Sequence, residues 1–567
     1  MISAPDIFGG LLDGISPGFL LIAAGLLIPV LPRLLRPVIA VLAPLAGLFH
    51  LLALPTGPHG TFEMLGITVA TINVSETGFA LGIAMLVAGT LAGVFNWHER
   101  AGLPVSAGLV YVGCAVGAVL AGDLPSFFLF FELASVSAAF LVWAGGTERS
   151  LGAGMRFAVA NILAGVLLLE AFLLTYKATG SVGFFTGDLG TSAGIYLILA
   201  LGLKAAFPVL HAWLTDAYPE STPGGTVLLS VFGITTAIYA LSRFLPGEDL
   251  LRLIGPIMIA FPVLLALLAN DLRRTLCYGI ISQAGLAVTA IGIGTPEALS
   301  AATVLMIANI FGFLVLFMAI GAVLYRTGTA SAAALGGLAA TMPLTTGFAV
   351  LGGLSVAGLP VLAGGTAVPY LMTAIWADGG PVVAALALFG VAGVWAHAGL
   401  RVPATAFFGE KRTPGLKAEE APVHMRFAML LGIAACIAVG TMPYWTGNAT
   451  FELAGLILHL EVLAFALLVF LAARAWGLLP REEPSALIDV DWLYRKLGPQ
   501  IVGVVMSVTS AAYTAWQNFI SSRINNGFRA MFATAGPQTN IASTWGTGLG
   551  VLWVAILLVV MLLVSYT

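Results

Sequence analysis

The sequence has little charge for its length. Only 9% of its 567 residues are charged, and 59% are hydrophobic; the mean hydropathy is +1.03. This composition excludes a soluble globular protein and indicates a chain that lives in a lipid bilayer. Its 23 basic and 26 acidic residues give a formal net charge of -3. Without a basic field to attract phosphates, we expect no nucleic-acid partner.

Cysteine is also scarce. The three cysteines (Cys114, Cys277 and Cys436) lie far apart, each within an apolar stretch, so they fit neither a disulfide framework nor a zinc site. The sequence offers no metal-ligand cluster, no phosphate-binding loop in a suitable context and no nucleophile beside a base. We therefore expect no catalytic residue, no metal and no cofactor. Any redox or other coupled reaction would belong to partner subunits.

Long apolar runs dominate the sequence. A helix needs about 20 apolar residues to cross a bilayer, and only helices or closed barrels satisfy their backbone in lipid. About sixteen runs are long enough, which predicts an all-α polytopic membrane protein with about 14–16 transmembrane helices. The first run begins near Pro17 with no basic leader before it. We expect that run to be retained as a helix, not cleaved as a signal peptide.

Basic residues predict the orientation of the chain. The loops after odd-numbered runs contain Arg33, Arg36, Arg100, Arg149, Arg273, Arg274, Arg326, Lys411, Arg412 and Lys417. The opposite loops contain little beyond Lys177 and Arg252. Because basic loops stay inside, we expect the odd-numbered loops in the cytoplasm and the N-terminus outside.

Residues 480–545 are too polar to cross the membrane. Within them, residues 500–534 mix apolar and polar side chains in the pattern of an amphipathic helix, which predicts a segment lying along a membrane surface or a partner, on the cytoplasmic side. The alternative is a solvated tail that only tethers the final transmembrane helix, residues 546–567.

Charge inside an apolar run is the most informative signal for function. The chain has five lysines, and only Lys204 lies inside such a run; an intramembrane cation is expensive enough to be a functional hypothesis by default. Glu132 is likewise surrounded by apolar turns, and Pro208 breaks the helix just after the lysine. A Glu132–Lys204 pair whose separation changes would switch protons, because each charge shifts the other's pKa. A static ion pair that fixes helix packing is the alternative.

Three more charged or titratable residues are candidates. His211 could relay protons between Lys204 and the cytoplasm, since imidazole titrates near neutrality; it could equally be a hydrogen-bonded structural residue. His397 and Arg401 are four residues apart, so they share one face of a helix. They could form a second proton entry or an interfacial anchor.

Five stretches of the sequence resemble one family. Residues 204–217 (KAAFPVLHAWLTDA), followed by Thr222-Pro223, resemble the K-A-A-x-F-P-x-H-x-W-L-P-D-A…T-P signature of the antiporter-like subunits of complex I and of Mrp cation/proton antiporters. Residues 270–285, Phe131-Glu132, 357–364 and 406–409 resemble further motifs of the same family. The resemblance covers roughly residues 75 to 410. Asp489 to Lys496, the amphipathic stretch and the final helix are similar to the D-type subunit of Mrp antiporters.

The resemblance implies an architecture and a setting. It implies two inverted five-helix repeats, each with a broken helix, at residues 122–250 and 251–410, between N-terminal helices (1–121) and C-terminal helices (411–479). Protons would be relayed along a charged axis at the membrane centre, with Glu132 and Lys204 as the first switching pair. The partners would be other membrane subunits in a bacterial inner membrane. The transported species would be protons, with Na+ or K+ as candidate coupled cations.

Three charges of that axis are missing. The positions at which the family has a lysine or glutamate fall at Thr235, Phe313 and Val368. Because an apolar path of that length would hold few waters, proton transfer through the second half would depend on His397 and Arg401 or on a partner. We therefore weigh two hypotheses, a subunit that contributes at least a proton half-channel and a degenerate scaffold that no longer transports. A stand-alone transporter of an organic solute would need a polar pocket, for which residues 364–366 are the only candidate.

Overall fold

A computed structural model describes the chain as two compact units, Met1–Asp489 and Val490–Thr567. The described residues are 14–64, 67–410, 412–413, 418–446, 453–478, 489–490, 492, 496–535 and 547–565. Thirteen of the described helices are long and apolar enough to cross a membrane, and three shorter apolar helices accompany them. The predicted fold class is therefore confirmed: the chain is a multi-pass, nearly all-helical membrane protein.

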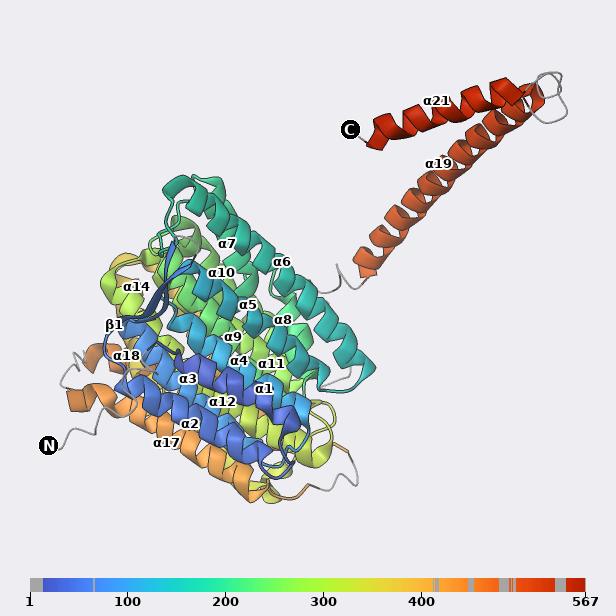
Figure 1. The fold of residues 1–567 in the computed structure, drawn as a ribbon. Coiled ribbons are helices and arrows are strands. Elements are labelled where there is room, and N and C mark those ends of the chain that lie inside the picture. The colour runs from blue at the N-terminus through green and yellow to red at the C-terminus, as the bar shows by residue number, and fades with distance from the viewer. Residues whose placement is uncertain are drawn as a thin grey trace. The chain divides into compact units, whose positions relative to one another are not determined.

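The first unit begins with four helices and a hairpin (Figure 1). These elements are α1 (Pro17–Leu27), α2 (Arg36–Ala53), β1 (Gly57–Met64), β2 (Ile67–Val74), α3 (Glu76–Phe95) and α4 (Gly102–Val119). The antiparallel hairpin β1–β2 was not among the sequence predictions. Asp123, which precedes α5 (Leu124–Trp143), ties the hairpin to the start of that helix. Its carboxylate accepts hydrogen bonds from the backbone N–H of Ala70 at 2.6 Å and of Ser126 at 2.8 Å. The carboxylate thus caps the helix and anchors the hairpin together.

Fourteen further α-helices of the first unit are described, and two of them, α9 and α11, are surrounded by the others. In chain order they are α5 (Leu124–Trp143), α6 (Glu148–Thr179), α7 (Ser192–Lys204), α8 (Ala212–Ala217), α9 (Pro223–Phe244), α10 (Asp249–Leu268), α11 (Leu272–Ile293), α12 (Pro296–Thr327), α13 (Pro343–Ala357), α14 (Gly364–Asp378), α15 (Pro381–Val394), α16 (Val402–Ala406), α17 (Val423–Thr446) and α18 (Leu453–Ala475). In the membrane-spanning parts of α9 and α11, 94% of the residues are buried, whereas in those of α2 and α18 the share is 22%. Groups on α9 and α11 therefore lie at the centre of the bundle.

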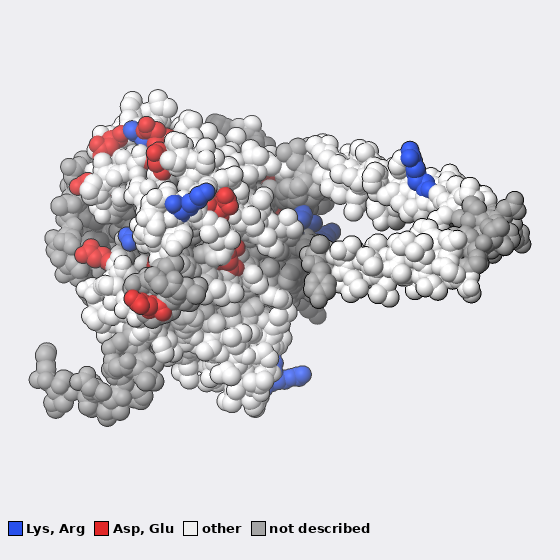
Figure 2. Space-filling model, turned by 45° about the horizontal axis from the view of Figure 1, so that its top comes forward, with Lys and Arg blue, Asp and Glu red and all other residues white. Residues whose placement is uncertain are grey.

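The outside of the bundle is apolar. Leu26, Val30, Leu253 and Phe465 are each more than 60% exposed, and large areas of the visible face carry no charged side chain (Figure 2). An apolar surface of this extent is expected where lipid tails or other membrane subunits cover it.

The first predicted helix break lies between α7 and α8. The backbone of Ala206 has φ 59° and that of Val209 has φ 71°, left-handed values that cost a non-glycine residue free energy. The N–H of Phe207 donates to the carbonyl of Gly202 at 2.9 Å, which closes the end of α7 in the manner of a Schellman motif. The strained turn ends the helix immediately after Lys204.

The second predicted break, between α13 and α14, repeats this geometry. Gly358 has φ 93° and Val361 has φ 73°, and the N–H of Leu359 donates to the carbonyl of Leu354 at 2.9 Å. In this turn Val356 occupies the place that Lys204 has in the first break, two residues before the left-handed residue. The two breaks are alike in backbone but not in charge.

The second unit contains two described helices, α19 (Gly498–Ala535) and α21 (Thr547–Ser565). The helix predicted at residues 500–534 is confirmed as α19, and the final helix as α21. The described side chains of both helices are exposed within the chain. That α19 lies along a membrane or a partner stays a prediction.

Candidate functional site

Glu132 and Lys204 form an ion pair inside the bundle. The Nζ atom of Lys204 lies 2.9 Å from Oε1 of Glu132, and the side chains of Lys204 and Glu132 are 6% and 22% exposed. The pair joins α5 to the last residue of α7, directly before the helix break. A buried ammonium needs such a partner, because desolvation of an unpaired charge is expensive.

The surroundings of Lys204 add polar and aromatic contacts. Its ammonium donates a short hydrogen bond to Oγ of Ser135 and lies 4.6 Å from the ring centroid of Phe131, a cation–π distance. Beside it is a cavity of about 30 Å³ whose lining includes Asn161 and Tyr218. The lining is mainly apolar, but a cavity of that volume has room for about two waters beside the ammonium of Lys204.

His211 lies after the break, where it meets a carboxylate that the sequence did not point to. Its Nε2 atom is 3.1 Å from Oδ1 of Asp489, and each of these side chains is 1% exposed. The phenol of Tyr278 donates a short hydrogen bond to Oδ2 of Asp489, and Nη2 of Arg274 is 3.5 Å from the same oxygen. His211 is therefore hydrogen-bonded, as the structural alternative predicted, but its partner is itself titratable.

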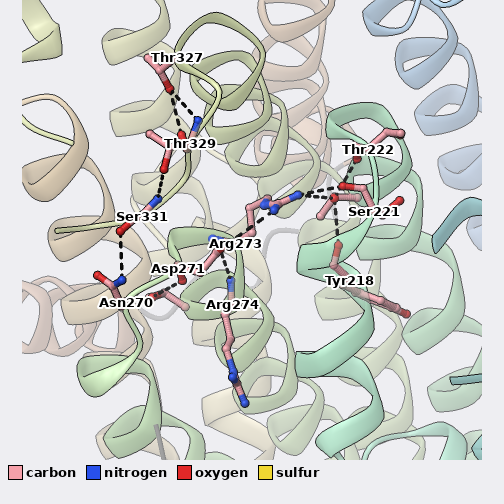
Figure 3. Close-up of polar contacts among 12 residues, drawn as sticks. Tyr218, Ser221, Thr222, Asn270, Asp271, Arg273, Arg274, Thr327, Thr329 and Ser331 are labelled. Carbon is pink, nitrogen blue, oxygen red and sulfur yellow. Dashed lines mark hydrogen bonds and ion pairs between the residues drawn. The ribbon is translucent and has the colours of Figure 1, made fainter. Parts of the chain in front are cut away.

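The start of α11 positions Arg274. The carboxylate of Asp271 caps this helix, accepting from the N–H of Arg273 at 2.7 Å. Figure 3 shows the two consecutive arginines leaving the helix in different directions. Arg273 donates to the carbonyl of Ser221 at 3.0 Å and holds the turn before α9. Arg274 points away from that turn and pairs with Asp489.

His397 and Arg401 are both buried, 0% and 5% exposed, in a π-helical turn that follows α15. The interfacial-anchor alternative is therefore wrong for them. Arg401 donates to the carbonyls of Ala266 at 2.7 Å and Ala269 at 3.0 Å, so it closes the end of α10. Neither ring nitrogen of His397 has a hydrogen-bond partner among the described residues.

The lost positions of the family axis fall into two environments. Val368 is fully buried in α14. Thr235 and Phe313 line one cavity of about 30 Å³, together with Gln283 and Asn309. Hydroxyl and amide groups thus interrupt a lining that is otherwise apolar. A β-carbon added at Gly279 would lie 3.2 Å from both Phe313 and Nε2 of His397, so the histidine and the ring both border Gly279.

The second helix break has neutral or histidine partners instead of a Glu–Lys pair. The side-chain amide of Gln283 donates to the carbonyl of Val356 at 3.3 Å. His459, 3% exposed, places Nε2 3.0 Å from the carbonyl of Gly358. His459 lies in an apolar run of the sequence, but nothing local to that run connects it with residue 358.

Two titratable residues outside the spanning segments have shifted pKa values. Burial raises the pKa of Glu220, an effect that the nearby Arg273 opposes. Burial lowers the pKa of His98, whose Nδ1 lies 3.2 Å from Nε2 of His424. Both Glu220 and His98 lie in turns that connect spanning helices.

Comparison of the sequence with known proteins finds one matching family and several relatives. Residues 121–393 match the family described as NADH:quinone oxidoreductase/Mrp antiporter, transmembrane. The chain is 29% identical over 316 residues to the D-type Na+/H+ antiporter subunit of Alkalihalophilus pseudofirmus, covering 52% of this chain and 64% of that protein. The match thus spans slightly less than two thirds of that relative's length. The chain is also 27% identical to the M-type subunit of NADH-quinone oxidoreductase from Pseudomonas aeruginosa, covering 69% of this chain and 86% of that protein.

A solved structure agrees in fold. A chain of the membrane-bound sulfane sulfur reductase, an archaeal respiratory membrane complex, superposes with a TM-score of 0.70 at 20% identity, over 96% of this chain and 99% of that one. The break motifs, the buried Glu132–Lys204 pair and the match over residues 121–393 agree with the resemblance found in the sequence. Residues 121–393 therefore match the transmembrane domain of the NADH:quinone oxidoreductase/Mrp antiporter family, as the sequence resemblance predicted.

Proposed function

We propose that the chain is a proton-carrying membrane subunit of a multi-subunit cation/proton antiporter or complex I-like assembly, not an enzyme in its own right. Glu132 and Lys204 contribute a half-channel, in which the lysine accepts and releases protons as the pair closes and opens. The single observation that carries the proposal is their 2.9 Å contact beside a strained helix break. A strained turn next to a buried ion pair supplies a place where the separation of the charges can change.

A route of uncharged polar groups toward the second repeat supports the transfer of protons through the whole subunit. The cavity lined by Thr235 and Phe313 lies among α9, α11 and α12, and water in it could bridge hydroxyl and amide groups. His397, which borders Gly279 together with Phe313, is the titratable group at that end. Arg401, which closes α10, serves as a positioning residue that fixes the π-helical turn.

Relatives favour the setting of this proposal. The similar proteins include a D-type Na+/H+ antiporter subunit and an M-type subunit of NADH-quinone oxidoreductase. Partners of this chain are accordingly other membrane subunits, its transported ions are protons with Na+ or K+ as candidate counter-ions, and its membrane is a bacterial plasma membrane. The basic loops orient the N-terminus outside and residues 480–545 toward the cytoplasm.

The experiment uses everted membrane vesicles that contain the native complex. Cation-dependent proton movement is followed by a pH-sensitive dye after addition of NaCl or KCl. We expect Lys204→Ala and Glu132→Gln, assembled normally, to lose most of this flux. Full flux in both variants would overturn the proposal.

A scaffold without transport is the second candidate, favoured by the neutral residues at Thr235, Phe313 and Val368. It predicts that both variants leave the flux of the assembly unchanged. It also predicts that deletion of residues 498–567, which removes α19 and α21, dissociates the complex. Co-purification of the neighbouring subunits with the full and the shortened chain separates the two candidates.

A further inference from the structure

Asp489 has a buried carboxylate, and it lies far along the sequence from the residues that it contacts. It is the last residue of the first unit and lies 278 positions from His211, the residue that it contacts. Its side chain is 1% exposed, although the sequence around it is polar. Burial of an ionised carboxylate is costly unless its charge and hydrogen-bonding capacity are met.

Among the described residues, His211, Tyr278 and Arg274 contact this carboxylate. His211 approaches Oδ1 at 3.1 Å from the break between α7 and α8. From α11, Tyr278 donates to Oδ2, and Arg274 lies 3.5 Å from the same oxygen. The carboxylate therefore has one oxygen toward the histidine and one toward groups that stabilise its negative charge.

We propose that Asp489 is a further proton-carrying residue of the first pathway, exchanging a proton directly with His211. The inference rests on the proposed function. In the forward step, the proton on Nε2 of a protonated His211 passes to Oδ1 of Asp489, which leaves a neutral imidazole and a neutral carboxylic acid. When the acid returns that proton to Nε2 of His211 or passes it to a water molecule, Arg274 and Tyr278 stabilise the carboxylate that is regenerated. No other bond forms or breaks.

The other ring nitrogen of His211 supports a relay and not a clamp. Its Nδ1 is buried and has no hydrogen-bond partner among the described residues. A structural histidine is normally satisfied at both nitrogens, because a buried donor or acceptor left without a hydrogen bond destabilises the fold. An unoccupied nitrogen can instead take up a proton while Nε2 passes one to Asp489.

The test is cation-dependent proton flux in vesicles that contain the native complex, measured for Asp489→Asn and Asp489→Glu. Asparagine keeps the size and the hydrogen-bonding oxygen of aspartate but cannot carry a proton, so we expect flux to fall at least about tenfold. Glutamate keeps the titratable group, and we expect flux within about threefold of wild type with a displaced pH profile. Asp249→Asn is the matched control, since that carboxylate is 93% exposed.

Each outcome decides the inference. Normal flux in an assembled Asp489→Asn complex overturns it, as does an equal loss in the Asn and Glu variants, which would make Asp489 a structural clamp. Should the Asn variant fail to assemble, the Glu variant decides alone, and an unchanged pH profile overturns the inference. Loss of flux in Glu132→Gln with full flux in Asp489→Asn overturns this inference only. Absence of cation-dependent flux in wild type overturns the proposed function with it.

Discussion

The backbone of α6 passes so close to Glu132 that a β-carbon at Gly165 would lie 2.3 Å from Oε2 of its carboxylate. A glycine at this position leaves the carboxylate room to reach Lys204 from α5. Because the nearest atoms belong to one short side chain held in an ion pair, the carboxylate must move if a methyl group is added.

We therefore expect Gly165→Ala to displace Glu132 and reduce cation-dependent proton flux by about tenfold, with little loss of thermal stability, since alanine favours a helix by roughly 1 kcal/mol over glycine. Gly347→Ala is the matched control, because a β-carbon at Gly347 in α13 meets no atom within 4 Å. Flux and the midpoint of thermal unfolding are measured on both variants. Equal flux in the two would show that the carboxylate does not need this space.

Arg401 contributes mainly to stability. Its guanidinium donates to two backbone carbonyls at the end of α10, Ala266 and Ala269, and charge-assisted hydrogen bonds are each worth about 1.5–3 kcal/mol. We expect Arg401→Gln to destabilise the folded chain by roughly 2–4 kcal/mol while each assembled complex keeps most of its flux. Thermal unfolding of the purified complex measures the first effect, and vesicle assays normalised to assembled protein measure the second. A stable but inactive variant would instead place Arg401 in the proton path.

For His397, in contrast to Arg401, we expect a substitution to reduce proton flux without reducing stability. Its ring nitrogens are unpartnered among the described residues, so an apolar replacement removes a buried polar group whose unmade hydrogen bonds cost about 1–3 kcal/mol. We expect His397→Phe to leave the thermal midpoint unchanged or higher and to lower the flux by about tenfold or more. Unaltered flux in this variant would exclude His397 from the second half of the pathway.

The two helix breaks, and Glu132 and Lys204 as charges within apolar runs, could be predicted because their signals are local. An intramembrane lysine followed by Pro208 identifies both the charge and the break, and the strained φ angles of Ala206 and Val209 are the physical form of that break. The hairpin β1–β2 also has a local signal, since six of the eight residues from Ile67 to Val74 are β-branched, as is typical of a strand. Eight residues are too few to stand out among runs of membrane-spanning length, so the hairpin was not predicted.

The partners of His211 and Gly358 could not be predicted in the same way. Asp489 lies in a polar stretch that composition assigns to the cytoplasm, and only the folded chain brings it to a fully buried position. His459 reaches Gly358 from 101 residues away. Contacts of this kind depend on which helices pack together, and residue spacing within one helix does not determine that.

Acid should destabilise the turn between α3 and α4. Because burial lowers the pKa of His98 from its ordinary value of 6.5, the unfolded chain takes up a proton at a higher pH than the folded chain does. The stability contribution is therefore complete above about pH 6.5 and is lost as the pH falls below it. We expect the thermal midpoint to decline as the pH falls below about 6.5, and His98→Gln to decline less. Parallel declines would show that other groups cause the effect.

In the proposed mechanism Lys204 exchanges protons and does not merely hold a charge opposite Glu132. Lys204→Arg separates these two roles, because arginine can keep the ion pair but does not deprotonate in proteins. The measurement is cation-dependent proton flux in vesicles, normalised to assembled complex. We expect Lys204→Arg to lose flux nearly as completely as Lys204→Ala. Flux close to wild type in the arginine variant, with the alanine variant inactive, would contradict proton exchange at Lys204 and identify the pair as a static contact.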